Sequence, residues 1–120
     1  MSDTPGKPLR ALLCGAVTQN FFDLPADAIG PVWQATGEML KGVRDLPGVK
    51  ILGTLDDDEL MVGTSPNGWP WTFYIMADMP DHATVVAACN LFRTTAVGEH
   101  LLWKYMRVEA RIGRDLTIPA

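Results

Sequence analysis

The residues of this chain that are best suited to chemistry are a histidine, a tyrosine and an arginine near its C-terminal end. His100 has an unperturbed pKa near neutrality, so its ring can donate or accept a proton at physiological pH. Tyr105 and Arg107 lie two positions apart, which places their side chains on one face of an extended strand. If these side chains face a cavity, Arg107 would hold the carboxylate of a ligand, and Tyr105 and His100 would transfer protons. The alternative for His100 is a solvated loop histidine. The alternative for Arg107 is an ion pair with Glu109 or with a second chain.

Five further side chains could line a binding site for a planar ring. Phe22, Trp71 and Trp103 offer flat apolar surfaces on which an aromatic ligand would stack. Tyr74 would add a polar head, and Asn20 lies in the loop that borders the expected pocket. Aromatic residues at strand spacing also fill ordinary cores, so the pattern leaves both interpretations open.

The chain offers little to a metal ion or a cofactor. Its two histidines exclude a histidine-rich metal site within one chain. The acidic run 56–59 lacks the glycine and the spacing of a calcium loop, and it fits a solvated turn better. Phosphate-binding glycine loops, nucleophile elbows and Cys-x-x-Cys pairs are missing from the sequence. We therefore expect no cofactor and no metal, and haem bound by His82 or His100 is a weaker alternative.

Composition predicts one globular domain of 120 residues, with 1–7 and 113–120 as tails that are flexible or contact a partner. A net charge of −4 argues against a nucleic-acid partner, and no apolar run is long enough to span a membrane. The absence of a secretory signal predicts a cytoplasmic protein. In that compartment, Cys14 and Cys89 would be reduced and packed in the core.

The stretch Trp69–Asp78 predicts a central strand, because it is rich in aromatic and β-branched residues and apolar on both alternating faces. Strands are also predicted over Pro8–Val17, Val49–Leu55 and Leu101–Ala110. Gly15, inside the first of them, indicates a bulge or a close approach of another chain segment. The acidic run and residues 60–63 predict either one long bulged strand or a short hairpin.

Two helices are predicted between these strands. The first begins near Gly30, after an expected cap at Asp23, and ends at Pro47–Gly48. One apolar stripe marks its core-facing side: Val32, Thr36, Met39, Leu40 and Val43. The second follows Asp81 as its cap and is expected to end at Gly98.

The order strand, helix, strand, strand, helix, strand predicts an α+β, ferredoxin-like fold with both helices on one face of a four-stranded antiparallel sheet. The other face would show Thr72, Tyr74 and Met76 beside Trp103, Tyr105 and Arg107. A patch this apolar favours a homodimer that hides on the order of 1,500 Å² and encloses a cavity between two sheets. A single-layer sheet with a smaller patch, or the opposite assignment of faces, is the alternative.

This order and length resemble the dimeric α+β barrel superfamily over nearly the whole chain. A narrower resemblance is to the IacB type, small proteins of bacterial gene clusters for indole-3-acetic acid degradation. It rests on five segments: QNFFDLP, LPGVKILGTLDDDELMVG, NGWPWTFYIMADMPD, AACNLFRT and LWKYMRVEAR. The resemblance implies a role in aromatic catabolism and leaves the reaction open.

Two functions remain in view. The first is binding of a small aromatic carboxylate such as an indole derivative, with or without cofactor-independent oxygenation, hydrolysis or isomerisation. The second is a non-catalytic dimeric binding or interaction module whose interior is filled by side chains.

Overall fold

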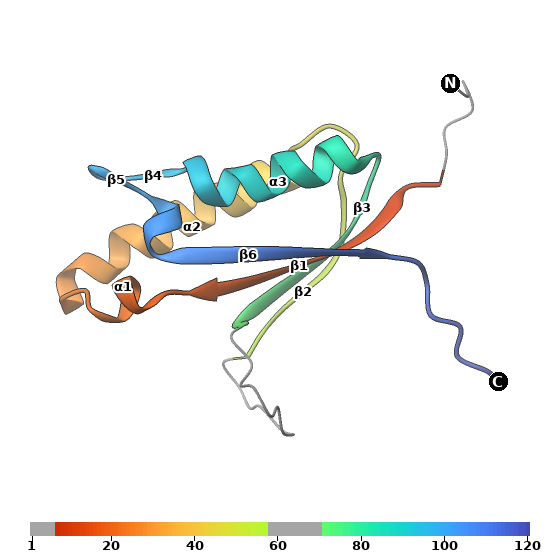
Figure 1. Ribbon diagram of the computed structural model, residues 1–120, viewed down its shortest axis with the longest axis horizontal. Helices are drawn as coiled ribbons and strands as arrows, with labels where there is room; N and C mark the ends of the chain where they lie inside the picture. Colours follow the sequence, from red (N-terminus) through yellow and green to blue (C-terminus); the bar gives the residue numbers. More distant parts are fainter. Residues whose placement is uncertain (1–6, 58–70) are drawn as a thin grey trace.

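The computed structural model describes residues 7–57 and 71–120 as one α+β unit with a sheet on one side and helices on the other (Figure 1). Its elements, in chain order, are β1 (Leu9–Val17), α1 (Gln19–Phe22), the 3₁₀ turn η1 (Ala26–Ala28), α2 (Ile29–Arg44), β2 (Lys50–Asp56), β3 (Phe73–Met79), α3 (His82–Thr94), β4 (Ala96–Val97), β5 (His100–Leu101), the 3₁₀ turn η2 (Leu102–Lys104) and β6 (Met106–Gly113).

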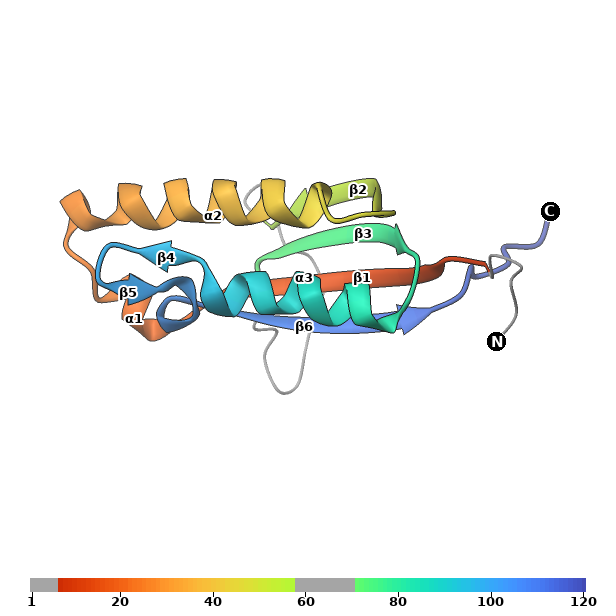
Figure 2. The same ribbon diagram turned by 90° about the horizontal axis from the view of Figure 1, so that it is seen from above.

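Four described strands form one antiparallel sheet in the order β2-β3-β1-β6, and β4 and β5 form a separate small hairpin. Figure 2 shows α2 over the β2–β3 side of this sheet and α3 over the β1–β6 side. The predicted α+β class and the antiparallel sheet are confirmed, and the strand order is consistent with a ferredoxin-like arrangement.

The core lies between β1, β3 and the two long helices, because alternate residues of the central strands point toward the helices. Leu13 of β1 and Ala77 of β3 are completely buried there, beneath Phe92 of α3. Gly15 is the point of close approach that its position in the strand predicts: a Cβ on Gly15 would lie 2.1 Å from the ring of Phe73. The β1 ladder runs past Gly15 without a bulge.

The predicted apolar stripe of the first helix is confirmed in α2, where Val32, Thr36, Met39 and Val43 are buried and Leu40 is half-buried. The Thr36 hydroxyl donates to the Val32 carbonyl over 2.8 Å, so its polar group is satisfied inside the core. The helix begins one residue before Gly30 and ends at Arg44, three residues before the expected stop.

The predicted cap of the second long helix is confirmed, because Asp81 accepts hydrogen bonds from the backbone N–H and the hydroxyl of Thr84, over 2.8 and 2.7 Å. The expected end at Gly98 is wrong, since α3 stops at Thr94. Gly98 instead has φ +58 between β4 and β5, where its missing side chain permits a left-handed turn.

Two other local predictions are corrected. Asp23 does not cap the helix that follows, because it lies at the C-terminal end of α1 and its carboxylate accepts from the Gln19 side chain over 3.0 Å. The short helix α1 itself lies in the segment that the sequence predicts as a loop. A bulge between Ile51 and Gly53 interrupts β2, and the rest of the expected bulged strand or hairpin lies outside the described residues.

The last strand begins at Met106 instead of Leu101, which changes where two aromatic residues lie. Leu102–Lys104 form the 3₁₀ turn η2, and Leu102 and Tyr105 are both buried in the core. The prediction that Trp103 and Tyr105 share the second sheet face with Arg107 is therefore wrong. A spacing of three residues between two buried side chains is the period of a 3₁₀ helix, and it overrides the alternation of a strand here.

No helix among the described residues is long and apolar enough to cross a membrane. Cys14 is a buried free thiol of β1 and Cys89 is a half-buried one of α3. Burial raises the pKa of both thiols, which keeps them protonated and weakly nucleophilic near neutral pH.

Candidate functional site

Two of the three residues predicted to be catalytic meet beside η2. His100, on β5, is exposed, and its ring packs edge-on against the buried ring of Tyr105 at 6.4 Å between centroids. The Lys104 ammonium lies 3.5 Å from Nε2 of His100. Tyr105 also accepts, through its backbone carbonyl, a 2.8 Å hydrogen bond from the backbone N–H of Thr18. Tyr105 thus fixes η2 against the end of β1.

The third predicted residue, Arg107, is held by its own neighbours. Its guanidinium lies 4.5 Å from the centre of the Trp103 ring and donates to the backbone carbonyls of Trp103 and Met106. The guanidinium of Arg93 approaches the same ring at 5.7 Å. Trp103 is therefore covered by two cations, which is a stabilising arrangement for an indole ring.

The residues predicted to bind substrate are spread over the molecule. Asn20 donates from its amide to the Lys104 carbonyl over 3.1 Å, so it ties α1 to η2. Phe22 is 64% exposed, and its ring packs edge-on against Phe21. Trp71 is half-buried just before β3. The structure brings Trp103 and Arg107 together but does not gather the predicted residues into one pocket.

The one predicted residue that lines a large cavity is Tyr74. A groove of about 1090 Å³ runs between α2 and the neighbouring ends of β2 and β3. Phe73, Ile75 and Leu40 provide apolar lining, and Trp33 of α2 contributes an indole ring that is 48% exposed. The groove exists because β2 stays uncovered along its length, apart from partial burial of Ile51.

Charged side chains of both signs border this groove. On α2, Lys41 contacts Glu38 at 3.3 Å and Arg44 contacts Asp45 at 2.8 Å. The hydrogen bond from Arg44 lowers the pKa of Asp45 below its ordinary value. All four side chains are largely exposed, so each pair is weak and open to exchange with a ligand.

On the strand side, the groove carries a hydroxyl and carboxylates. The Tyr74 hydroxyl donates to the Asp57 carboxylate over 3.2 Å, and Asp56 lies beside them at the end of β2. A tyrosine hydroxyl in contact with a carboxylate can hold or pass a proton to a bound molecule. The groove therefore joins aromatic surface and two cations, and the Tyr74–Asp57 pair lies at its strand edge, with the Tyr74 side chain on the face that carries Leu55 and Met76.

Sequence reasoning missed most of this groove because its residues follow no single period. Trp33, Lys41 and Arg44 lie on the side of α2 that does not carry the buried stripe, which the sequence presents as a solvated face. Tyr74 and Asp57 come from different strands and meet only in the antiparallel pairing of β2 with β3. A tryptophan on the polar side of an amphipathic helix was the one available signal.

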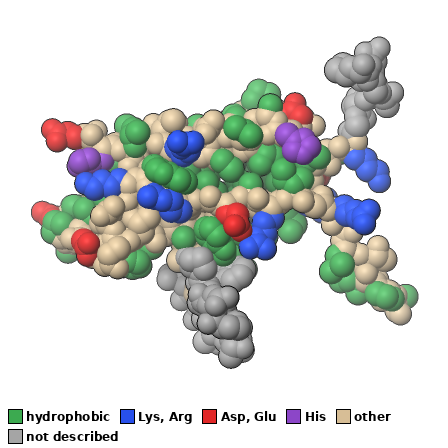
Figure 3. All heavy atoms as spheres, in the orientation of Figure 1, with side chains coloured by type: hydrophobic (Ala, Val, Ile, Leu, Met, Phe, Trp, Pro, Cys, Tyr) green, Lys and Arg blue, Asp and Glu red, His purple; other side chains and the backbone are tan. Residues whose placement is uncertain are grey.

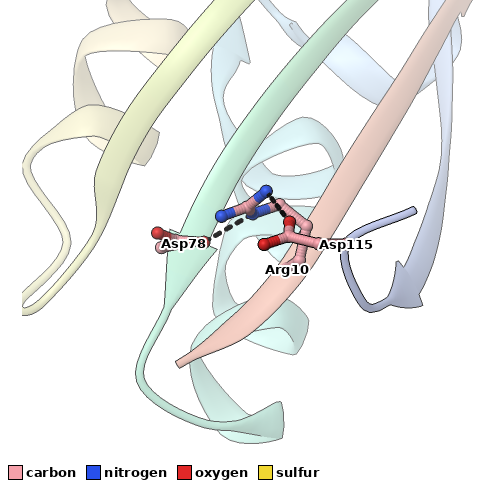
Figure 4. A network of polar contacts seen from close by, with 3 residues as sticks. All are labelled: Arg10, Asp78 and Asp115. Carbon is pink, nitrogen blue, oxygen red and sulfur yellow. Dashed lines mark hydrogen bonds and ion pairs between the residues drawn. The ribbon is translucent and has the colours of Figure 1, made fainter. Parts of the chain in front are cut away.

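The sheet face turned away from the helices, here called the outer face, is covered by no described element (Figure 1). Met76 and Leu55 are 40% and 65% exposed on it, and Leu12 is half-buried beside Met76. At one end, Arg10 bridges two carboxylates, Asp78 at 2.7 Å and Asp115 of the C-terminal segment (Figure 4). Its hydrogen bond to Asp78 raises the pKa of Arg10.

Among residues 7–57 and 71–120, no three His, Cys, Asp or Glu side chains are grouped so that they could hold a metal ion. Comparison with known proteins adds no relative: no family model, no curated protein and no solved structure matches the chain.

Proposed function

We propose that this chain forms a homodimer that binds a small aromatic carboxylate in the groove between α2 and the β2–β3 edge. The proposal includes a role in bacterial indole-3-acetic acid catabolism, as a binding protein or a cofactor-independent oxygenase, hydrolase or isomerase. The observation that carries the binding is the groove itself, where an exposed indole, the ring of Phe73 and two cations line one space of about 1090 Å³.

The ring of such a ligand would lie against Trp33 and Phe73, because flat apolar surfaces reward stacking and exclude water. Its carboxylate would reach Lys41 or Arg44. The guanidinium of Arg44 can grip two carboxylate oxygens at once, and the ammonium of Lys41 acts as a point charge. The ligand would displace Asp45 or Glu38 from these cations, at little cost because both pairs are exposed.

Tyr74 and Asp57 are in contact and border the groove, but the Tyr74 side chain lies on the outer face with Met76 and with Leu55, its cross-strand partner. A ligand between α2 and the sheet would therefore not contact the Tyr74 hydroxyl directly. His100, Tyr105 and Arg107 are the residues that the sequence favours for catalysis, and none of them lines the groove. The groove is therefore the better-supported place for a ligand.

The test is isothermal titration calorimetry of the full chain with indole-3-acetate and other aromatic acids. Lys41→Ala and Arg44→Ala should each weaken binding about tenfold, since each removes a charge-assisted contact of about 1.4 kcal/mol or more. Lys50→Ala is the matched control, because it removes an equal charge from an exposed position outside the groove. Absence of heat with every acid, or equal losses in all three variants, would refute the binding site.

The second candidate function is a dimeric interaction module without a ligand. The uncovered outer face, with Met76 and Leu55 exposed, supports it. Sedimentation velocity separates the two: a dimer that gives no heat with any aromatic acid favours the module, and a dimer that binds one favours the proposed ligand function.

A further inference from the structure

The segment after β6 carries the most exposed apolar side chains of the described chain. Residues 114–118, here called the C-terminal arm, follow the last strand without helix or strand structure. Leu116 is 87% exposed and Ile118 is 83% exposed, more than any other large hydrophobic side chain recorded in the structure. Figure 3 shows hydrophobic side chains on this projecting segment, away from the body of the molecule.

The start of the arm is fixed in place. Asp115 pairs with Arg10, which in turn pairs with Asp78 on β3, so the arm leaves the sheet from the end where β1 begins (Figure 4). Leu116 and Ile118 are two positions apart, so in an extended conformation both point to the same side. This is the pattern of a strand that has one apolar face and no neighbour.

A surface that matches such a strand lies along β2. Among the strands of residues 7–57 and 71–120 it is an edge strand, so within that part of the chain one row of its backbone N–H and C=O groups faces outward. Leu52 and Leu55 are 40% and 65% exposed on it, and the groove described above opens beside it. An added strand would pair with this edge and place alternate side chains over the groove.

Leu116 of the same molecule cannot reach the far end of that surface, where β2 borders the groove. Gly113, where the arm begins, pairs with Arg10, whereas Phe73 at the groove pairs with Gly15. The distance from Arg10 to Gly15 is about 17 Å along the strand, and crossing from β6 to β2 adds about 14 Å sideways. Leu116 lies three residues beyond Gly113, which gives a reach of about 10 Å. The start of β2 is level with Gly113, because Lys50 pairs with Asp78 and Asp78 pairs with Arg10, so this limit applies to the far end of β2. Only a second copy can place Leu116 there.

We infer that in the dimer the C-terminal arm of each copy lies along β2 of the other copy and closes the open side of its groove with Leu116 and Ile118. The charges of the two surfaces are complementary, because Arg114 on the arm would meet the acidic end of the groove at Asp56 and Asp57. The exchange is reciprocal, as a two-fold axis requires.

This inference rests on the homodimer of the proposed function and extends it, since each binding groove would be completed by side chains of the partner. The groove is far larger than one or two aromatic rings need, so the arm and a small acid can share it. Closure by the arm would also shield the ligand from water, which strengthens its contacts with the cations.

Disulfide trapping between two variants, each with one new cysteine at a different position, tests the arrangement directly. Thr54→Cys and Leu116→Cys would be made separately in a Cys89→Ser background, mixed, and oxidised under mild conditions, because Thr54 is exposed on β2 and lines the groove. The mixture should give a covalent dimer on a non-reducing gel, and neither protein alone should do so. Val86→Cys replaces Thr54→Cys as the matched control, because Val86 is 58% exposed on α3, away from β2. No trapping in the first mixture, equal trapping with Val86→Cys, or trapping of Leu116→Cys with itself would overturn the inference.

Sedimentation velocity of Leu116→Ser/Ile118→Ser separates failure of the arm from failure of the dimer. Both side chains are exposed within one copy, so the circular dichroism spectrum should stay unchanged while the dimer dissociation constant rises at least tenfold. A variant with the same dimer dissociation constant as the parent chain would refute the proposed role of the arm but not the proposed dimer. A parent chain that sediments as a monomer would overturn both, and neither result depends on whether an aromatic acid binds.

Discussion

Substitution of Gly15 by alanine tests how tightly the central strand meets the ring that lines the groove. A Cβ at this position would lie 2.1 Å from Cζ of Phe73, far inside van der Waals contact, so the ring must move. Phe73 is stacked on Phe92 at 6.1 Å, and Phe92 is completely buried, which leaves the ring little freedom on that side. The substitution therefore forces a rearrangement of the core.

The expected loss of unfolding free energy in Gly15→Ala follows from two opposing effects. Overpacking of a filled core typically costs about 1–3 kcal/mol, and replacing glycine by alanine returns about 0.5–1 kcal/mol by restricting the unfolded chain. A net loss of about 1–2 kcal/mol remains. At about 2.1 cal/mol/K of unfolding entropy per residue, this lowers the melting temperature of a chain of this size by roughly 4–8 °C.

Differential scanning calorimetry with two companion variants isolates the cause. Gly53→Ala is the matched control, because the same Cβ on Gly53 would meet no atom within 4 Å. Phe73→Leu shortens the obstructing side chain, so Gly15→Ala should cost less than about 0.5 kcal/mol in that background, as a double-mutant cycle would report. Equal melting temperatures for Gly15→Ala and Gly53→Ala, or additive losses in the cycle, would refute the reasoning.

Three further outcomes follow from contacts elsewhere in the fold. Thr84 holds the pKa of Asp81 below its ordinary value through hydrogen bonds, so the cap stabilises α3 at neutral pH and is lost as the pH falls through the folded-state pKa. Asp81→Ala should lower the melting temperature at pH 7 and flatten its fall in acid, whereas Asp81→Asn should keep most of the capping. Thr36→Val should change unfolding stability by less than about 0.5 kcal/mol, and Thr36→Ser should cost about 1 kcal/mol, because the buried methyl contributes more than the hydroxyl. Arg107→Gln should cost less than about 1 kcal/mol in a denaturant melt, the usual size of an exposed cation–π contact with a ring such as Trp103, and a larger loss would show that Arg107 does more than cover that ring.

Elements with one dominant period were predictable from the sequence. The apolar stripe of α2 repeats at helical spacing, and it is buried as expected around Met39 and Val43. Asp81 before α3 has the local chemistry of a cap, and it needs no distant residue to act as one. The class of the fold followed from the order of such elements.

Features that depend on distant contacts were not predictable in the same way. The stretch around Leu102 and Tyr105 is apolar on both alternating faces, which predicts a strand, and the packing of η2 against α3 and α2 turns both side chains into the core instead. The groove depends on how far β2 lies from α2, a distance that no run of residues encodes. Tyr74 was found because it is an aromatic residue in a strand, and Trp33 was missed because it stands on a polar helix face.

The position of β1 at the middle of the sheet bears on how the molecule is assembled. Leu13 pairs with Ile75 on one side and with Ala110 on the other, so both edges of β1 are satisfied only after β6, the last strand of the described residues, has formed. Pairings this remote in sequence slow folding to the millisecond-to-second range typical of topologies built on distant contacts. Until β6 pairs with it, one edge of β1 exposes unpaired backbone N–H and C=O groups.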